Sequence, residues 1–315
     1  MGTTASRSLD YRHITTMPTG ADISLAIHTI TGREPGPCFL IFGGIHGDEA
    51  TAVEAVRRIV EAVDENELKG TLVAVPVSNP YAYESMTRHT TQDGLNLNRI
   101  FPGDAGGSLT EQLAAALVEI QEGADYFIDF HSSGLYSTVD YAYVHSGAEI
   151  LARNYGTSLL YHHDPYTGSS AEMMLSAGKP AMVSELGGGG QLTTDFLDRS
   201  VAGTLNVLRA VGMLPGDPVD PPEQKVMTKL VTLRPTTGGA VISDYGPETL
   251  GSVVPGGTVL GRVVNPHTFE VMEELVAPFD ETIIVLTREQ YTRCAPGDYG
   301  FMVGDNGSVT TVDAI

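Results

Sequence analysis

Short runs of consecutive apolar residues alternate with helical stretches between about residues 20 and 212 of this chain. The apolar runs lie at 38–44, 71–77, 126–130 and 181–186, and the helical periodicity lies at 49–64, 109–122 and 195–212. An uninterrupted apolar run is typical of a strand that is buried on both faces of a sheet. Its alternation with helices predicts an α/β domain with a largely parallel sheet.

The pattern changes at the proline-rich stretch PGDPVDPP, residues 215–222, which is typical of a linker. Beyond it the chain consists of runs rich in β-branched residues that are separated by glycine turns. We therefore expect a catalytic domain over residues 1–222 and a small all-β domain, similar to a barrel-sandwich, over residues 223–315.

Charge and cysteine content exclude several classes of protein. The chain carries 39 acidic and 18 basic residues, a net charge of −21, whereas proteins that bind nucleic acid or anionic membranes need clustered Lys and Arg. Cys38 and Cys294 form no CxxC pair, the first twenty residues hold no apolar signal sequence, and no apolar stretch is long enough to span a membrane. We expect a cytoplasmic protein; a homodimer or higher homo-oligomer is left open.

A candidate metal motif follows the first apolar run. GGIHGDEA places His46 and Glu49 three residues apart where a strand gives way to a helix, and ligands of open α/β sheets bind at this edge. Imidazole and carboxylate are both ligands that zinc accepts. The motif has an alternative interpretation, because a glutamate in the first turn of a helix is also favoured by the helix dipole.

His131 strengthens the metal interpretation because it follows the strand YFIDF and so lies at a second strand end. Two His and one Glu form the three-residue ligand set of a catalytic zinc site, in which water takes the fourth position. Asp129, on the same strand face, is a candidate to orient His131 through its second ring nitrogen. It could equally be an ordinary polar residue at the end of a strand.

Glu185 is the candidate general base. It ends the strand AMVSEL and precedes four glycines. A buried carboxylate is costly unless it is used, and consecutive glycines indicate a close approach of the backbone to another group. The alternative is a helix cap or a loop acid.

Arg88, Asn98 and Arg99 are candidates for substrate binding, because they lie in a glycine-containing loop of an otherwise acidic chain. A guanidinium matches a carboxylate with two parallel hydrogen bonds, and an asparagine amide can add another. Surface salt bridges, which contribute little to stability, are the alternative for both arginines.

The other histidines are weaker candidates for metal ligands. His162 and His163 are adjacent, and neighbours in sequence rarely both reach one metal, so we expect them at the surface or at a pocket rim. His89, His145 and His267 have no metal-binding company in the sequence. The β-rich region resembles a biotinyl or lipoyl carrier, but its hairpin lacks the lysine that carries such a cofactor.

The motifs GGIHGDE, NPYAY, DGLNLNRIFPG, DFHSSG and SELGGGG, in this order, resemble the succinylglutamate desuccinylase/aspartoacylase family of the zinc carboxypeptidase clan. The resemblance covers roughly residues 38–212 and extends to the C-terminal β region. It implies a zinc-carboxypeptidase-like mixed β-sheet flanked by helices, which refines the parallel sheet expected above. It also implies one Zn²⁺ per chain and a small N-acyl amino acid as substrate.

The resemblance also implies roles for single residues. His46, Glu49 and His131 are the zinc ligands, and Glu185 is the general base. Asn98 and Arg99 bind the substrate carboxylate, and Arg88 polarises the scissile carbonyl or holds the acyl group. The further Arg and Tyr by which aspartoacylases bind the side chain have no secure counterpart, although Tyr166 is a candidate. The pattern most resembles the members that deacetylate N-acetyl-diaminobutyrate.

The function expected from the sequence is therefore zinc-dependent hydrolysis of the amide bond of an N-acyl amino acid, which releases a carboxylate and a free amine. A zinc carboxypeptidase acting on peptides is the first alternative, and a long open groove would favour it. A non-catalytic metal-binding protein is the second, and a missing ligand or base would indicate it.

Overall fold

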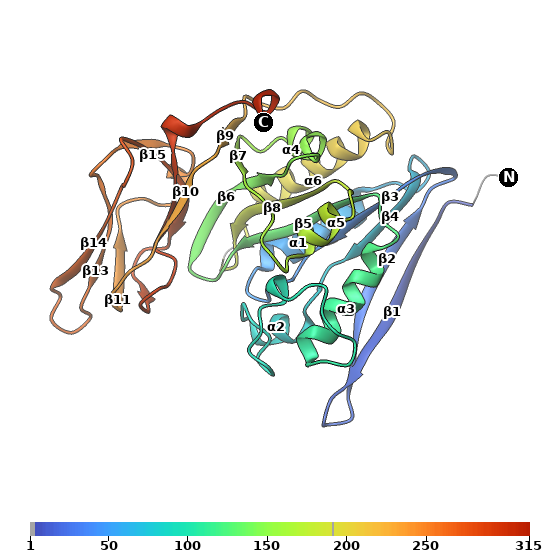
Figure 1. Cartoon of the computed structure of the whole chain (residues 1–315), viewed down its shortest axis with the longest axis horizontal. Coiled ribbons are helices and arrows are strands. Elements are labelled where there is room, and N and C mark those ends of the chain that lie inside the picture. The colour runs from blue at the N-terminus through green and yellow to red at the C-terminus, as the bar shows by residue number, and fades with distance from the viewer. Residues whose placement is uncertain (1–3, 191) are drawn as a thin grey trace.

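The computed structural model describes residues 4–190 and 192–315, and its main feature is one sheet of thirteen strands (Figure 1). The strand order is β1-β2-β4-β3-β5-β8-β6-β15-β17-β10, with β12 beside β15, β7 beside β6, and β9 beside β7. The strands of this sheet are β1 (Ser6–Thr16), β2 (Asp22–Thr31), β3 (Glu34–Phe42), β4 (Lys69–Val75), β5 (Tyr126–Ser133), β6 (Ser137–Val144), β7 (Leu159–His162), β8 (Ala181–Gly188), β9 (Lys225–Met227), β10 (Leu230–Leu233), β12 (Val253–Pro255), β15 (Glu281–Arg288) and β17 (Phe301–Asp305).

The four strands predicted from apolar runs form the centre of this sheet. β4, β3, β5 and β8 are parallel neighbours, so their carboxyl ends lie at one edge. Their apolar side chains pack on both faces, as in Phe39, Leu40, Ile41 and Phe42 of β3, which are fully buried. The predicted strand-to-helix junctions therefore meet where ligands of such sheets bind.

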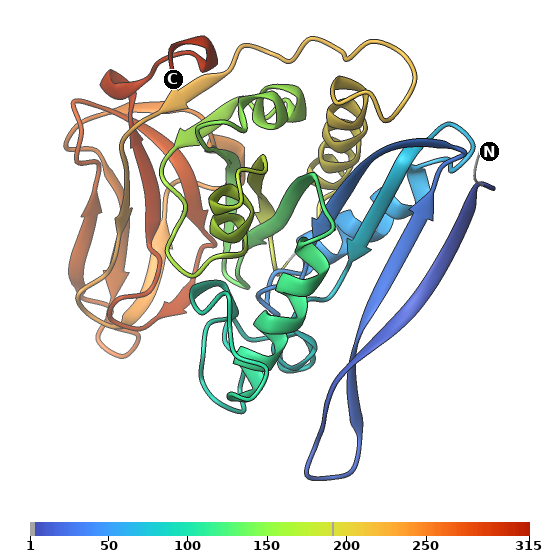
Figure 2. The same cartoon turned by 45° about the vertical axis from the view of Figure 1, so that its right-hand side comes forward.

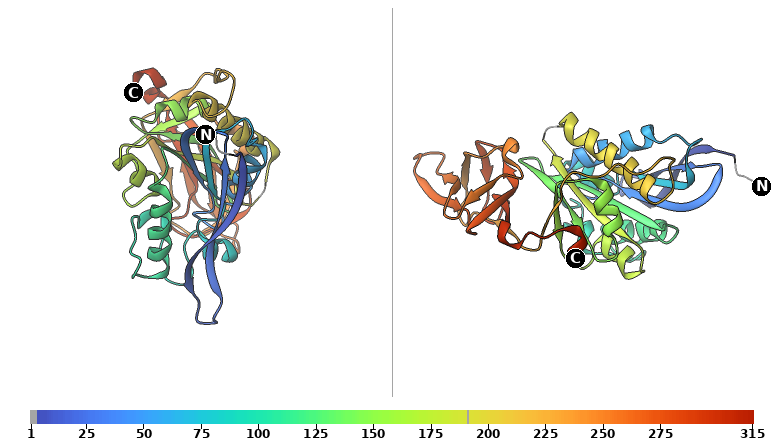
Figure 3. Two further views of the ribbon diagram at one scale, coloured as in Figure 1. Left: turned by 90° about the vertical axis from the view of Figure 1, so that its right-hand side faces the viewer. Right: turned by 90° about the horizontal axis from the view of Figure 1, so that it is seen from above.

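Helices cover both faces of the sheet. Three long helices fall where the apolar periodicity predicts them, and three short ones were not predicted from the sequence. The helices are α1 (Ala50–Ala62), α2 (Pro80–Ser85), α3 (Leu109–Gln121), α4 (Glu149–Tyr155), α5 (Ser170–Ser176) and α6 (Thr194–Ala210). Figure 3 shows α1 and α6 on one face and α3 and α5 on the other. Each face holds its own apolar core.

Antiparallel strands make the sheet mixed, as the family resemblance implies. β1 and β2 form an N-terminal hairpin that projects from the body of the protein (Figure 2). β6 lies antiparallel to β8, with Tyr141 opposite Glu185 and Tyr143 opposite Val183. The expectation of a largely parallel sheet holds for the four predicted strands, whereas the antiparallel strands of the hairpin and β6 were not predicted from the sequence.

The C-terminal region is built of β-strands, as expected. β10, β15 and β17 continue the main sheet, because β15 pairs with β6. A separate antiparallel sheet has the order β14-β13-β11-β16 and consists of β11 (Gly239–Ser243), β13 (Val259–Val264), β14 (Val271–Val276) and β16 (Thr292–Cys294). Residues 217–224 before it form neither helix nor strand. The domain boundary at residue 222 stays a prediction, and residues 1–3 and 191 of the first expected domain lie outside the described part of the chain.

None of the described helices is long and apolar enough to cross a membrane.

Candidate metal centre

The loop between β3 and α1 positions His46 and Glu49. Glu49 is the N-cap residue of α1, and both side chains are buried, with 2% of each residue exposed. The loop passes so close to α2 that a Cβ added to Gly47 would lie 1.8 Å from the carbonyl carbon of Ala82. Only glycine fits this place, which explains Gly47 of the GGIHG segment.

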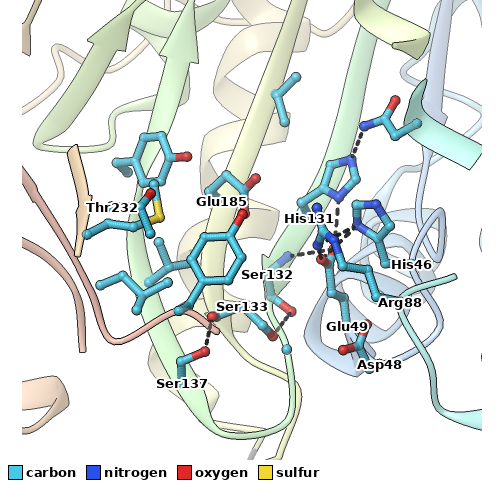
Figure 4. A pocket seen from close by; sticks show the side chains of 18 of the residues that line it. His46, Asp48, Glu49, Arg88, His131, Ser132, Ser133, Ser137, Glu185 and Thr232 are labelled. Atoms are coloured by element: carbon cyan, nitrogen blue, oxygen red, sulfur yellow. Dashed lines mark hydrogen bonds and ion pairs between the residues drawn. The ribbon is translucent and has the colours of Figure 1, made fainter. Parts of the chain in front are cut away.

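His46, Glu49 and His131 converge on one point (Figure 4). Glu49 Oε1 lies 2.8 Å from His46 Nδ1, and Glu49 Oε2 lies 2.8 Å from His131 Nδ1. One ligand atom from each residue lies within 4.8 Å of the others, and within residues 4–190 and 192–315 this is the one group of this kind. The structure thus brings together the three predicted ligands from two strand ends.

The outer ring nitrogens of both histidines are held by side-chain oxygens. His46 Nε2 lies 3.1 Å from Asn96 Oδ1, and His131 Nε2 lies 3.0 Å from Asp129 Oδ2. Because these oxygens accept a hydrogen bond from Nε2, the Nδ1 of each ring is the nitrogen that can bind a metal once the ring is neutral. Ser170 Oγ in turn donates to Asp129. Asn96 was missed in the sequence, although it stands in the DGLNLNRIFPG motif beside Asn98 and Arg99.

The donor set fits a zinc ion. Two imidazole nitrogens and a carboxylate are ligands that zinc prefers, and metal binding needs a neutral imidazole and an ionised carboxylate. Burial and Arg88 lower the pKa of His46 to about 4. Burial opposes the ionisation of Glu49, but His46 and His131 outweigh it and hold its pKa well below the usual range. Burial also opposes the protonation of His131, yet Asp129 and Glu49 raise its pKa, so a cation at Nδ1 displaces a proton.

Glu185 reaches the same site from β8. It is the Cα partner of His131 in the parallel β5–β8 pair, and in the view of Figure 4 it lies between His131 and Thr232. Burial and Glu49 raise its pKa, while His131 lowers it, and the result is a pKa of about 8. The glycines after it permit close packing, since a Cβ on Gly189 would lie 1.7 Å from the carbonyl oxygen of Asp48.

Arg88 lies at the ligands themselves. Its Nη1 is 3.2 Å from Glu49 Oε1 and 3.3 Å from His46 Nδ1. Asp48, which sequence reasoning did not select, lines the same cavity, and burial and Glu49 raise its pKa to about 6. The guanidinium therefore lies where it can meet the carbonyl oxygen of a molecule bound at the ligands.

Asn98 and Arg99 belong to the short 3₁₀ helix Leu97–Arg99. Asn98 Oδ1 accepts a hydrogen bond of 2.9 Å from the Ser170 N–H, and its Nδ2 lies 3.2 Å from His131 Nε2. Arg99 donates to the Asn98 carbonyl at 2.6 Å, and its guanidinium lies 4.6 Å from the centre of the Tyr166 ring. Asn98 thus lies beside a candidate ligand and lines the cavity, and its role toward substrate stays a prediction.

A cavity of about 500 Å³ is lined by the three candidate ligands together with Asp48, Arg88, Asn98, Arg99 and Glu185. Its far wall comes from the C-terminal region and includes Thr232, Arg234, Asp298 and Tyr299. Pockets of this size are typical of small-molecule sites. The C-terminal region therefore contributes to the shape of the cavity.

A family model described as the succinylglutamate desuccinylase/aspartoacylase catalytic domain matches residues 35–211. The chain is 29% identical over 272 residues to an N-alpha-acetyl-L-2,4-diaminobutyric acid deacetylase of Halomonas elongata, and the match covers 80% of this chain and 76% of that protein.

Two solved structures share the fold along nearly the whole chain. One is the product-bound ectoine utilization protein EutE (DoeB) of Ruegeria pomeroyi, with a TM-score of 0.85, 23% identity and 95% of each chain covered. The other is a succinylglutamate desuccinylase of Silicibacter sp. TM1040, with a TM-score of 0.84, 22% identity, and 96% of this chain and 95% of that chain covered.

Proposed function

The chain belongs to the succinylglutamate desuccinylase/aspartoacylase family, and from this premise we propose that it is a zinc-dependent deacylase that hydrolyses the amide bond of an N-acetylated amino acid. Nα-acetyl-2,4-diaminobutyrate is the substrate that the relative from Halomonas elongata suggests. The observation that carries the proposal is the position of Glu185 opposite His131, inside one cavity with the three ligands, Arg88 and Arg99.

His46, Glu49 and His131 hold the zinc ion. A bound zinc ion supplies Lewis acidity, which lowers the pKa of water and polarises a carbonyl group. Glu185 accepts a proton from the attacking water as the new C–O bond forms. It then donates this proton to the amide nitrogen as the C–N bond breaks, which yields a carboxylate and an amine.

The arginines position the substrate and stabilise charge. Arg88 donates to the carbonyl oxygen as negative charge develops on it. Arg99, with Asn98, anchors the α-carboxylate so that the amide carbon faces the water. Both guanidinium groups line the cavity, which supports this division of roles.

A peptidase of the same clan is the rival function, because it would use the same ligands and the same carboxylate anchor. The C-terminal wall of the cavity favours a small substrate over a long peptide. A non-catalytic metal-binding protein is disfavoured by the presence of a carboxylate base and two arginines beside the ligands.

A panel of N-acetyl, N-succinyl and N-formyl amino acids and of dipeptides, assayed with the zinc-loaded protein, tests the proposal. We expect turnover of N-acetyl amino acids above all others. Turnover of dipeptides alone would establish the peptidase instead.

A further inference from the structure

His145 places an unpartnered nitrogen at the wall of the active-site cavity. It follows the last residue of β6, and only 3% of it is exposed. Its Nδ1 lies 2.6 Å from the carbonyl oxygen of His163, whereas its buried Nε2 has no hydrogen-bond partner among the described residues. Buried polar atoms are nearly always paired, so this nitrogen needs an explanation.

The hydrogen bond to His163 fixes which proton His145 carries. A carbonyl oxygen only accepts, so Nδ1 must donate, and Nε2 is left as an acceptor when the ring is neutral. Burial favours the neutral ring, because it lowers the pKa of His145 more than the His163 carbonyl raises it. His145, a residue that lines the cavity, therefore carries a fixed acceptor that no other described residue uses.

Aromatic rings connect this acceptor with the proposed carboxylate anchor. The Tyr143 ring stacks on His145 at 5.8 Å and an angle of 12°, and the Tyr166 ring meets Tyr143 edge-on at 6.1 Å. Arg99 lies over the other end of this row, 4.6 Å from the centre of the Tyr166 ring. All of these residues line the cavity. We call Tyr143, His145 and Tyr166 the His145 subsite.

We propose that the His145 subsite binds the side chain of the substrate amino acid and selects a side chain that ends in a primary amine. An ammonium group donates to Nε2 and is attracted by the faces of the tyrosine rings. A side-chain carboxylate would face a lone pair and would lose its hydration without gaining a donor there. This inference rests on the proposed function, because it takes Arg99 as the anchor of the α-carboxylate.

Two substrates that differ at one group test the inference. Nα-acetyl-2,4-diaminobutyrate and N-acetylnorvaline have side chains of the same length, which end in an ammonium and in a methyl group. The measured quantity is the ratio of kcat/KM for the first substrate to that for the second. Wild-type protein should favour the amine, since a hydrogen bond to a charged group changes such a ratio by about tenfold or more.

Three variants locate the effect. His145→Asn keeps an N–H that can reach the His163 carbonyl but removes Nε2, and it should lower the ratio by about tenfold or more. His145→Gln places an amide oxygen near the position of Nε2 and should restore part of the ratio. His162→Asn, at a neighbouring histidine outside the cavity lining, should leave the ratio unchanged. Thermal unfolding of each variant shows whether the fold is retained.

Binding of free 2,4-diaminobutyrate and norvaline to the zinc-loaded protein, measured by calorimetry, separates the two proposals. If wild type turns over neither substrate but prefers the diamine in binding, and His145→Asn removes this preference, the subsite stands and the proposed function fails. If both substrates are turned over and His145→Asn leaves the ratio as in wild type, the function stands and the subsite is wrong. If neither assay distinguishes the amine from the methyl group, the subsite is also wrong.

Discussion

Glu185 and His131 are direct partners on neighbouring parallel strands, β8 and β5, at the edge of the sheet where both strands end. Partners of this kind lie about 4.8 Å apart between strands. The candidate base is therefore tied to a candidate zinc ligand through the backbone of the sheet and not through a flexible loop. Because the two side chains are fixed relative to each other, single substitutions at or near them have defined expected effects.

Asp129→Asn should weaken zinc binding. Asp129 accepts from His131 Nε2 at 3.0 Å, and the loss of such a carboxylate beside a ligating histidine lowers metal affinity by about 10- to 100-fold. Competition with a chromophoric chelator measures the affinity. Asp125→Asn is the matched control, because Asp125 lies just before the same strand and accepts from the Cys38 N–H, away from the ligands. Equal zinc affinity in both variants would contradict the role of Asp129.

Gly47→Ala should disrupt both the fold and the site. The added methyl group would meet backbone of α2 at 1.8 Å, so the loop that carries His46 and Glu49 must move. We expect a loss of about 2–3 kcal/mol in the free energy of unfolding, together with weaker zinc binding. Gly123→Ala is the control, because its added Cβ would meet nothing within 4 Å. Urea unfolding of the two variants compares them, and a Gly47→Ala protein as stable as wild type would refute the packing argument.

Arg99→Lys should raise KM far more than it lowers kcat. A lysine keeps the charge but loses the paired hydrogen bonds that a guanidinium offers a carboxylate. We expect KM to rise by about tenfold or more. The same change at Arg209, in the last turn of α6, serves as a control that should leave KM unaltered. A change in kcat without a change in KM would assign Arg99 to the chemical step instead.

Glu185→Gln should stabilise the metal-free protein at high pH. The pKa of Glu185 is about 8 in the folded protein and 4.5 in an unfolded chain, so the folded state binds more protons between these values and wild type loses stability as pH rises through them. Glutamine cannot ionise, so the variant should be more stable than wild type at pH 8, on the order of 4 kcal/mol, since one pKa unit corresponds to about 1.4 kcal/mol. Thermal unfolding in chelator checks this; the difference should vanish below pH 4.5. A constant difference at all pH values would exclude ionisation as its cause.

The sequence predicts the centre of the fold because the residues there are buried on both sides. Phe39 to Phe42 form a continuous apolar run, and such runs identify β3, β4, β5 and β8 as well as the strand ends that carry His46, His131 and Glu185. The β1–β2 hairpin was not predicted, because most of β1 is exposed and shows neither an apolar run nor a regular alternation. β1 is a strand because it pairs with β2, and not because of its own residue pattern.

Supporting residues of the site were harder to find. Asn96 contacts His46 across fifty positions of the chain, and its place in the DGLNLNRIFPG motif carries no sign of this contact. His145 was set aside because no other metal-ligand residue stands near it, and its significance depends on the His163 carbonyl and on a cavity wall that only the folded chain assembles. The spacing of residues in the sequence thus predicts those that act together at a strand end, whereas contacts between distant loops are seen only in the structure.

The most direct test of the account is to measure bound zinc and turnover of an N-acetyl amino acid in the same preparation of Glu185→Gln. The account predicts one zinc ion per chain, as in wild type, and a loss of kcat of about 100-fold or more, because the ligands are intact while the proton acceptor is gone. Full zinc content with turnover close to that of wild type would contradict Glu185 as the base.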